Sequence, residues 1–159
     1  MKDGPPTRIG VLGGGQLGLM LAEAGEPLGL SFRVLDPNPE APAGRGREIV
    51  CAAFDDAGAI DRFADGLDVA TFEFENVGPE TLARLERVVP LRPGARSLEM
   101  KHDRLVEKRF LESCGLEVPR HAAVDSEEDL AAALDAVGDR GILKTRRFGY
   151  DGKGQVRID

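Results

Sequence analysis

Aromatic side chains are scarce in this chain: of 159 residues one is tyrosine and none is tryptophan. Surfaces that stack the bases of single-stranded nucleic acid depend on such rings, so their scarcity disfavours that class of protein. The formal net charge of −7 also disfavours nonspecific binding to DNA or to anionic membranes. We therefore expect neither a nucleic-acid partner nor a membrane partner.

Cysteine and histidine are equally rare, with two of each. Cys51 and Cys114 lie in different segments without a C-x-x-C spacing, which predicts reduced, structural thiols. His102 and His121 have no neighbouring ligand pattern, so we expect no zinc site and no metal-binding residues in this chain.

Long apolar runs are also missing. No stretch approaches the roughly 20 residues that cross a bilayer. The first residues, Met1-Lys-Asp-Gly-Pro-Pro6, lack the apolar core of a signal peptide. The expected location is the cytoplasm.

Short apolar strands alternate with helical patterns through the first part of the chain, which indicates right-handed βαβ crossovers and a mostly parallel sheet. The expected strands are residues 8–12, 31–35, 48–52 and 68–74, and the expected helices are residues 16–28, 56–64 and a segment beginning at Pro79. Within 16–28, apolar residues three and four apart predict one apolar helix face, and Gly29 is expected to end the helix. They are Leu17, Met20, Leu21, Ala24 and Leu28.

The pattern changes near Pro90-Leu-Arg-Pro-Gly94. Residues 1–95 carry 9 cations and 15 acids, whereas residues 96–159 carry 12 cations and 13 acids. We therefore predict two domains, 1–95 and 96–159. In the second we expect a long helix over 97–114, an extended segment over 119–124, a helix from Ser126 to 137, and strands over 141–145 and 155–158.

Gly13-Gly-Gly15-Gln-Leu-Gly18 follows the first strand and opens the first helix, and Asp36 ends the second strand. This arrangement fits the dinucleotide fingerprint, in which the acid holds a ribose. It also fits a tight turn needed only for steric reasons, or a helix N-terminus that binds a lone phosphate or carboxylate. The motif alone leaves these interpretations open.

Thr71-Phe-Glu-Phe-Glu-Asn-Val77 alternates apolar and acidic residues, which predicts a strand with Phe72 and Phe74 on one face and Glu73 and Glu75 on the other. These acids would be solvated in an ordinary strand. At the C-terminal end of a parallel strand, where open α/β sheets bind ligands, they could instead hold hydroxyls or a cation together with Asn76.

The strongest motif lies between Lys144 and Gln155. Four cations (Lys144, Arg146, Arg147 and Lys153) surround the spacing Gly149-x-x-Gly152-x-Gly154. Glycine backbone amides and cations together bind phosphate. An ordinary hairpin is the alternative, since Asp151-Gly152 is a favoured turn pair. Lys101, Arg104 and Lys108 form a further cationic stripe, which nearby acids could neutralise as a solvated helix face.

Together these segments resemble 5-(carboxyamino)imidazole ribonucleotide synthase, an ATP-grasp family of purine biosynthesis. The resemblance runs in family order through Gly10–Met20, Val34–Pro37, Thr71–Val77, Asp103–Lys108 and Leu143–Gln155. It implies an α/β fold: a Rossmann-like pre-ATP-grasp domain with a parallel sheet, followed by an incomplete α+β ATP-grasp subdomain. It also implies a homodimeric enzyme.

The resemblance implies ATP-dependent carboxylation of 5-aminoimidazole ribonucleotide by bicarbonate, through carboxyphosphate, to give 5-(carboxyamino)imidazole ribonucleotide, ADP and phosphate. Arg104 and Lys144 would contact ATP phosphates, beneath a flexible loop of Gly149, Tyr150, Asp151, Gly152, Lys153, Gly154 and Gln155. Gln16, Tyr150, Asp151 and Lys153 would contact the ribonucleotide, which disfavours the nicotinamide interpretation of the glycine motif.

The family's acidic Mg²⁺ ligands lie in a second ATP-grasp subdomain, and no carboxylate pair of that kind follows Gln155. We therefore expect no catalytic residue within this chain and no turnover by the 159 residues alone. Three rival functions remain at this point: another ATP-grasp carboxylase or formyl-phosphate enzyme, an NAD-linked oxidoreductase domain, and a non-catalytic nucleotide-binding module.

Overall fold

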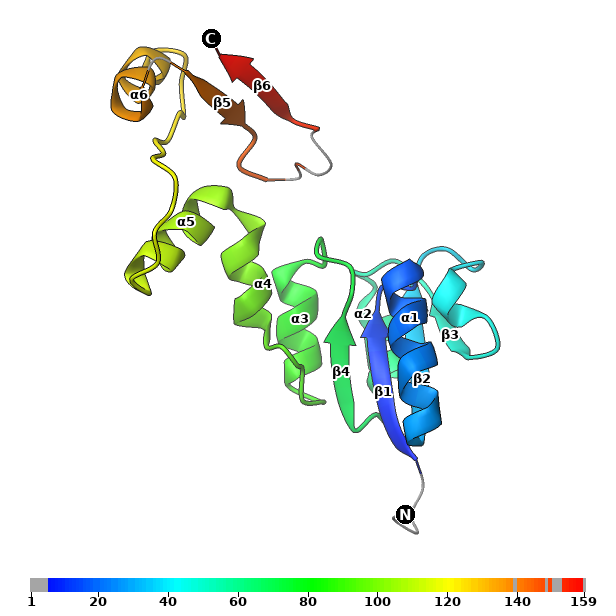
Figure 1. The fold of residues 1–159 in the computed structure, drawn as a ribbon. Helices are drawn as coiled ribbons and strands as arrows, with labels where there is room; N and C mark the ends of the chain where they lie inside the picture. The colour runs from blue at the N-terminus through cyan, green and yellow to red at the C-terminus, as the bar shows by residue number, and fades with distance from the viewer. Residues whose placement is uncertain (1–5, 139, 148, 150–152, 159) are drawn as a thin grey trace. The chain divides into compact units, whose positions relative to one another are not determined.

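The structure, a computed structural model, describes residues 6–138, 140–147, 149 and 153–158. The chain divides into two compact units, Met1–Leu98 and Glu99–Asp159. Figure 1 traces both units from blue to red along the chain.

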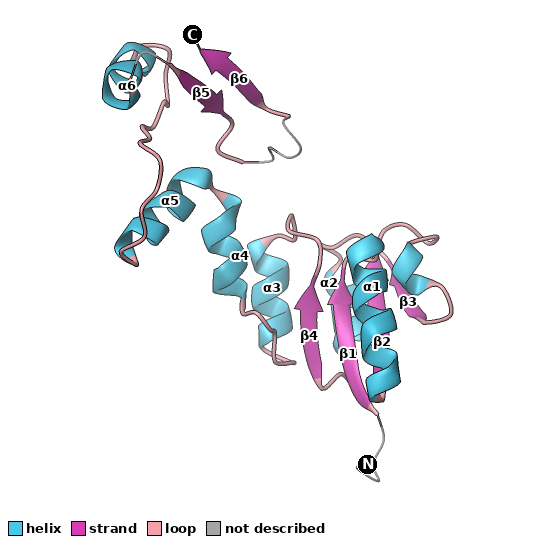
Figure 2. Cartoon of the chain, in the orientation of Figure 1, coloured by secondary structure: helices cyan, strands magenta, loops and turns pink. Residues whose placement is uncertain are grey.

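A four-stranded parallel sheet forms the centre of the first unit (Figure 2). Its strands are β1 (Thr7–Leu12), β2 (Leu30–Asp36), β3 (Glu48–Cys51) and β4 (Val69–Phe72), in the order β3-β2-β1-β4. The order places β1 between β2 and β4 and carries the carboxyl ends of all four strands to one edge. The predicted parallel sheet is confirmed.

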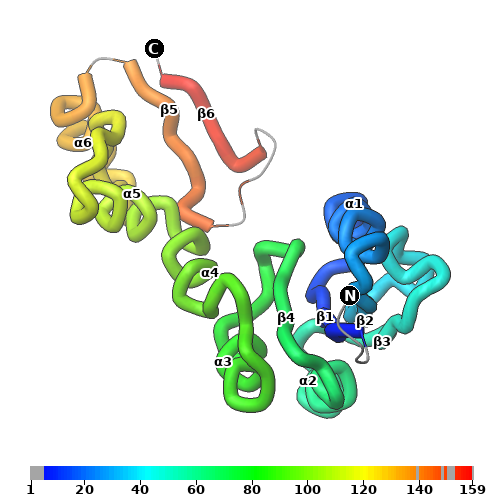
Figure 3. The backbone as a smooth tube through the Cα atoms, turned by 60° about the horizontal axis from the view of Figure 1, so that its bottom comes forward, coloured from blue at the N-terminus to red at the C-terminus, as the bar shows by residue number. Residues whose placement is uncertain are grey.

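Helices cover both faces of this sheet (Figure 3). Helix α1 (Gln16–Gly25), continued by the 3₁₀ turn η1 (Glu26–Leu28), lies on one face; α2 (Ala57–Ala64), which packs against α3 (Pro79–Glu86), lies on the other. A second 3₁₀ turn, η2 (Pro42–Gly44), follows β2. The larger apolar core lies on the α2 and α3 side and includes Leu12, Leu35, Ile60, Phe63, Leu82, Leu85, Leu91 and Leu98. The α1 side holds a smaller one of Val11, Ala22 and Phe32.

The apolar residues of the predicted helix face do not lie against the sheet. Leu17 is 64% exposed, Met20 61% and Leu28 78%. Small residues, Gly18, Ala22 and Gly25, face the sheet instead. A Cβ on Gly18 would lie 2.9 Å from the Gly13 carbonyl oxygen, and one on Gly25 would lie 2.4 Å from the Phe32 ring, so α1 approaches the sheet too closely for larger side chains. The apolar stripe therefore faces away from the sheet.

Arg33 is a residue of β2, and its side chain caps the C-terminus of α2. Although it is only 7% exposed, its Nη1 donates to the carbonyl oxygens of Phe63 (2.8 Å), Arg62 (3.2 Å) and Asp65. Its Nε lies 2.8 Å from Glu48 Oε1, an ion pair without the alignment of a hydrogen bond. A cation among these carbonyls satisfies acceptors that the helix leaves unpaired and complements its dipole.

Replacing Arg33 with Met should destabilise the first unit by about 2 kcal/mol, because buried carbonyl oxygens lose a charged donor. Arg8 supplies a matched control: it contacts the same Glu48 at 3.1 Å, but its side chain is 43% exposed. Arg8→Met should cost less than about 1 kcal/mol, as exposed ion pairs do. Urea unfolding of the two variants tests the difference. Equal losses would show that Arg33 contributes only its pair with Glu48.

The predicted long helix over 97–114 is two helices, α4 (Ala95–His102) and α5 (Arg104–Ser113). Asp103 separates them in an extended conformation (φ −129°, ψ 116°), and its carboxylate accepts from the Leu105 and Val106 N–H groups as the N-cap of α5. Aspartate competes with helical hydrogen bonding in this way and so favours a break at Asp103. The apolar periodicity continues on either side of Asp103, and for this reason it predicted one helix.

The rest of the second unit contains α6 (Asp129–Val137) and the antiparallel pair β5 (Gly141–Lys144) and β6 (Gln155–Ile158). Both strands were predicted. The helix begins later than expected, because Ser126 does not cap it; its N–H instead donates to the Asp129 carboxylate at 2.8 Å. Ile142 and Val156 are 57% and 64% exposed, and Ala133 is the buried apolar residue of this unit within its described part. No helix in the described part of the chain is both long and apolar enough to span a membrane.

Candidate functional site

The glycine turn after β1 is held by Asp36. The Gly14 N–H donates to Asp36 Oδ2 at 2.7 Å, while Asp36 Oδ1 accepts from the Asn38 N–H at 2.8 Å. The Gly14 carbonyl oxygen accepts from the Ala43 N–H at 2.9 Å. A dinucleotide would need the glycine N–H for its pyrophosphate and the carboxylate for its ribose. Because these two groups bind each other here, the geometry disfavours the dinucleotide interpretation.

Gln16 and Glu73 lie on either side of this turn. Gln16 is the exposed first residue of α1, where helix N–H groups attract anions. Glu73 directly follows β4, with its N–H bonded to the Leu12 carbonyl oxygen at 2.8 Å. Its carboxylate is so near the turn that a Cβ on Gly15 would lie 3.2 Å from Oε1. The carboxyl edge of the sheet thus combines a helix N-terminus, an amide side chain and a carboxylate.

The strand predicted over 68–74 is shorter than expected, since β4 ends at Phe72. Glu73 and Glu75 therefore do not alternate along a strand, and Glu75 is exposed in a turn whereas Glu73 is half-buried. Phe74 leaves the sheet and stacks on Phe54, with ring centroids 5.0 Å apart. The hydrogen bonds from Glu73 and Phe74 N–H groups to Leu12 end the regular pairing. The acids do lie at the carboxyl edge, as the motif predicted.

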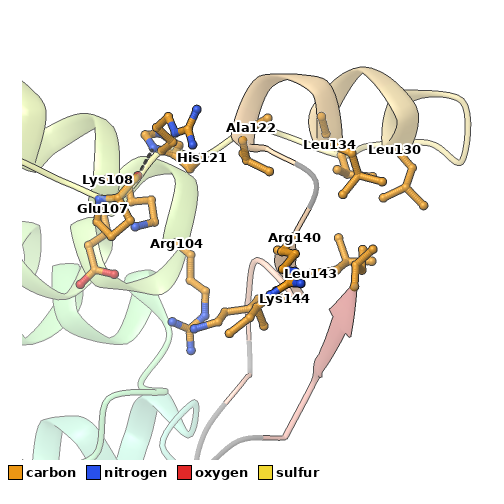
Figure 4. Close-up of a pocket in the computed structure, with 18 residues that line it drawn as sticks. Arg104, Glu107, Lys108, His121, Ala122, Leu130, Leu134, Arg140, Leu143 and Lys144 are labelled. Atoms are coloured by element: carbon orange, nitrogen blue, oxygen red, sulfur yellow. Dashed lines mark hydrogen bonds between the residues drawn. The ribbon is translucent and has the colours of Figure 1, made fainter.

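In the second unit, Arg104 and Lys144 lie at the edge of one cavity of about 580 Å³. Figure 4 shows their side chains pointing toward one another, with Leu130, Leu134 and Leu143 grouped farther along the cavity. Arg104 opens α5, and Lys144 ends β5. Within the described residues, no hydrogen bond or ion pair engages Lys144 Nζ. The cavity therefore has a cationic end and an apolar wall.

The glycine loop begins and ends against Thr145. The Thr145 N–H donates to the Gly154 carbonyl oxygen at 2.8 Å, and Gly154 has a positive φ of 69°. Arg104 Nη2 donates to the Gly149 carbonyl oxygen at 3.2 Å. Gln155 opens β6 opposite Lys144, and Lys153 is exposed. Tyr150, Asp151 and Gly152 lie outside the described residues.

Arg146 and Arg147 share an acidic partner, which was not predicted from the sequence. Arg146 Nη2 lies 2.8 Å from Asp103 Oδ2, and Arg147 Nε lies 3.6 Å from the same oxygen. Burial raises the pKa of Asp103, but the hydrogen bonds from Arg146 and from the α5 amides outweigh burial and hold that pKa below its usual value. The resulting stability is present above the ordinary carboxyl pKa and is lost as the pH falls through the lowered one.

Asp103 and Asp125 were not among the predicted site residues. Asp103 precedes Arg104 and begins a helix, so its position before an amphipathic run was an available signal for a cap. The stripe of Lys101, Arg104 and Lys108 does not lie on one helix, because Asp103 interrupts it. No cluster of three or more potential metal ligands occurs among the residues that the structure describes.

Residues 6–102 match the family described as the ribonucleotide synthetase preATP-grasp domain, and residues 109–159 match the ATP-grasp domain. The parallel α/β unit and the antiparallel pair β5–β6 agree with these two matches, which place the chain in the ATP-grasp class. The chain belongs to the ribonucleotide synthetase preATP-grasp domain family. The predicted fold class is confirmed.

Relatives named N5-carboxyaminoimidazole ribonucleotide synthase are similar throughout the chain. The one from Pseudomonas aeruginosa is 49% identical over 148 residues, which are 93% of this chain and 41% of the relative. The structure of the synthetase from Thermus thermophilus is 53% identical, with a TM-score of 0.88 over 94% of this chain and 40% of that one. The Aspergillus clavatus synthase in complex with ADP and 5-aminoimidazole ribonucleotide is 25% identical, with a TM-score of 0.81 over 98% and 41%. The chain thus spans about two fifths of the length of these relatives.

Proposed function

We propose that this chain is the nucleotide-binding part of an enzyme of purine biosynthesis in the cytoplasm. The enzyme carboxylates 5-aminoimidazole ribonucleotide with ATP and bicarbonate. The products are 5-(carboxyamino)imidazole ribonucleotide, ADP and phosphate. The observation that carries this proposal is the cavity whose edge holds Arg104 and Lys144 beside a glycine loop, in a chain similar to synthetases of that name.

Arg104 and Lys144 would bind the ATP phosphates. Both have a fixed backbone position, because the Arg104 N–H donates to the Arg146 carbonyl oxygen at 3.0 Å and Lys144 lies in a paired strand. Cations placed in advance stabilise the charge that develops as a phosphoryl group is transferred. Gly149, Tyr150, Asp151, Gly152, Lys153, Gly154 and Gln155 would cover the phosphates. Mg²⁺ would accompany ATP, held by carboxylates in the part of the relatives that this chain does not span.

The ribonucleotide would contact Gln16 in the first unit, with Tyr150, Asp151 and Lys153 as further contacts. The N–H groups at the start of α1 attract a phosphate, and Gln16 adds a neutral donor beside them. Glu73, at the same edge, offers an acceptor for ribose hydroxyls or for the amine that is carboxylated. A site that combines anion and hydroxyl binding suits a ribonucleotide better than a bare phosphate.

A chimera tests this function directly. Residues 1–159 replace the corresponding part of the Pseudomonas aeruginosa relative, to which they are 49% identical over 148 residues. The expected result is phosphate release from ATP that requires both bicarbonate and 5-aminoimidazole ribonucleotide. A folded chimera that hydrolyses ATP equally well without the ribonucleotide would contradict the proposed substrate. A chimera that reduces a nicotinamide cofactor would support the oxidoreductase alternative.

The 159 residues alone should not catalyse the carboxylation. They offer cations and a glycine loop, while the proposed Mg²⁺ ligands belong to the unspanned part of the relatives. Phosphate release by the purified chain with all three substrates should stay at the level of a no-protein control. Turnover above that level, removed by Lys144→Met, would show that these residues suffice for chemistry.

We further propose that two copies of the chain associate through the outward stripe of α1. Leu17, Met20, Leu21, Ala24 and Leu28 form an exposed apolar row without a charge within it. A self-complementary surface of this kind suits a two-fold interface, in which the same patch serves both partners. Burying this row in an interface would be favourable by roughly 25 cal/mol per Å² of apolar surface removed from water.

Sedimentation equilibrium tests this association. The unaltered chain should form a dimer that dissociates about a hundredfold more readily after Met20→Glu, because a charge would enter the apolar contact. Val88→Glu is the matched control, since Val88 is 62% exposed but lies outside the stripe; it should leave the dimer intact. A chain that is monomeric at every concentration, or one that both substitutions affect equally, would rule out the α1 interface.

A further inference from the structure

The Asp103 side chain contacts two separate segments of the second unit, the start of α5 and the residues that follow β5. Asp103 is 4% exposed, and its Oδ1 accepts from the Leu105 and Val106 N–H groups at the start of α5. Arg146, next to β5, donates from Nε to Oδ1 at 3.1 Å and places Nη2 2.8 Å from Oδ2. This two-pronged contact fixes the plane of the guanidinium relative to α5.

Backbone hydrogen bonds join the same two segments. The Arg104 N–H donates to the Arg146 carbonyl oxygen at 3.0 Å, so Arg146 is also joined through its backbone to the residue that follows Asp103. Arg104 Nη2 then reaches the Gly149 carbonyl oxygen, and Thr145 binds Gly154. Every described end of the glycine loop is thereby connected to the start of α5.

The two glycines fit closely into this arrangement. A Cβ on Gly154 would lie 2.6 Å from Thr145 Oγ1, and one on Gly149 would lie 3.0 Å from the same oxygen and 3.6 Å from Arg104 Nη2. Thr145 and Arg104 therefore pack against the loop backbone itself. A shift of Arg146 relative to α5 would move both loop ends and the Arg104 side chain together.

We propose that Asp103 is a positioning residue, which through Arg146 sets the placement of Arg104 and of the backbone at Gly149 and Gly154 relative to Lys144. It contacts no substrate in this role. The consequence for ATP rests on the function proposed above, whereas the placement of Gly149 and Gly154 does not.

Asp103→Asn tests the proposal, since asparagine caps a helix as well as aspartate but loses the charge that holds Arg146. Hydrogen exchange without ligand gives the first readout. The Thr145 and Arg104 amides should exchange at least about tenfold faster in the variant, because local opening becomes easier. The Gly138 amide, bonded to Leu134 in α6, should be unaffected. Uniform acceleration of all three amides would show general destabilisation and overturn the proposal.

ATP affinity, measured by calorimetry, gives the second readout. Asp103→Asn and Arg146→Gln should each weaken ATP binding about tenfold, and the double variant should be no weaker than either single one, because both changes break the same contact. Asp125→Asn is the matched control: Asp125 touches Arg146 Nη1 at 3.2 Å, but its side chain is 69% exposed and caps no helix. It should change the ATP affinity less than about twofold.

The two readouts separate the possible failures. Normal exchange and normal ATP affinity in Asp103→Asn would overturn the positioning role. If the unaltered chain binds no ATP, the proposed function fails for this chain, and the exchange rates of Thr145 and Arg104 still decide whether Asp103 holds the loop. Additive effects of Asp103→Asn and Arg146→Gln would show that the two residues act independently, which also contradicts the proposal.

Discussion

Lys144→Met should lower kcat/KM for ATP at least about a hundredfold in the chimera, because it removes a fixed cation from the phosphate that is transferred. Lys144 is suited to this role by its place at the end of a paired strand and by the lack, within the described residues, of an acid that neutralises it. Methionine keeps the length and the apolar stem, so the fold of β5 should survive. Arg104→Met should have a smaller effect, about tenfold, because one N–H group of Arg104 is already bound to the Gly149 carbonyl oxygen and is not available to phosphate.

The control for Lys144→Met is Lys101→Met, an exposed lysine in α4 that does not line the cavity. Its kcat/KM should stay within about twofold of the unaltered chimera, as expected for a surface substitution. Thermal unfolding of each variant establishes that the fold is retained. If both lysine variants lose activity alike, the loss reflects net charge and not the position of Lys144.

Gly13→Ala should destabilise the first unit by about 3–5 kcal/mol, the sum of strain at a positive φ and of overpacking. Gly13 has a φ of 99°, and a Cβ there would lie 2.8 Å from the Phe74 backbone nitrogen and 2.7 Å from Glu73 Oε2. Because backbone cannot rotate away as a side chain can, β4 or the glycine turn would have to move. The same movement would displace Glu73 from α1.

Gly29→Ala separates the two contributions. Gly29 has a similar positive φ of 79°, but no atom lies within 4 Å of a Cβ placed on it. It should cost only about 1 kcal/mol, the strain of a left-handed residue. Denaturant unfolding of both variants gives the comparison. Equal costs would mean that the turn adapts to a side chain, and that its close contact with Glu73 and Phe74 does not constrain it.

The parallel sheet was predictable because each buried strand is marked by an apolar run followed by turn residues, as in Val11-Leu12 before the glycines. The orientation of α1 could not be predicted from the sequence. Periodicity identifies an apolar stripe, but it does not say whether that stripe or a row of small residues lies against the sheet. Only the close approach at Gly18 and Gly25 decides this, and it depends on the positions of the Gly13 carbonyl and the Phe32 ring.

For the candidate site, the glycine spacing and the cations predicted a phosphate site around Lys144, and the family resemblance gave Arg104 its proposed role. The structure places both residues in the lining of one cavity. The sequence could not show that Arg146 would be bound by Asp103, 43 residues earlier, because that pairing depends on how α5 and β5 come together. Nor could it show that Asp36 binds the glycine turn, which removes it from the dinucleotide fingerprint.

Titration of the isotope-labelled chain with MgATP, followed by amide chemical shifts, tests most directly the claim that the cationic cavity binds the ATP phosphates. We expect saturable amide shifts at Arg104, Lys144, Thr145, Gly149 and Gly154, and none of these shifts in Lys144→Met at the same ATP concentrations. Shifts confined to the glycine turn of the first unit, around Gly13 to Gln16, would contradict this claim, as would identical titrations of the chain and of Lys144→Met.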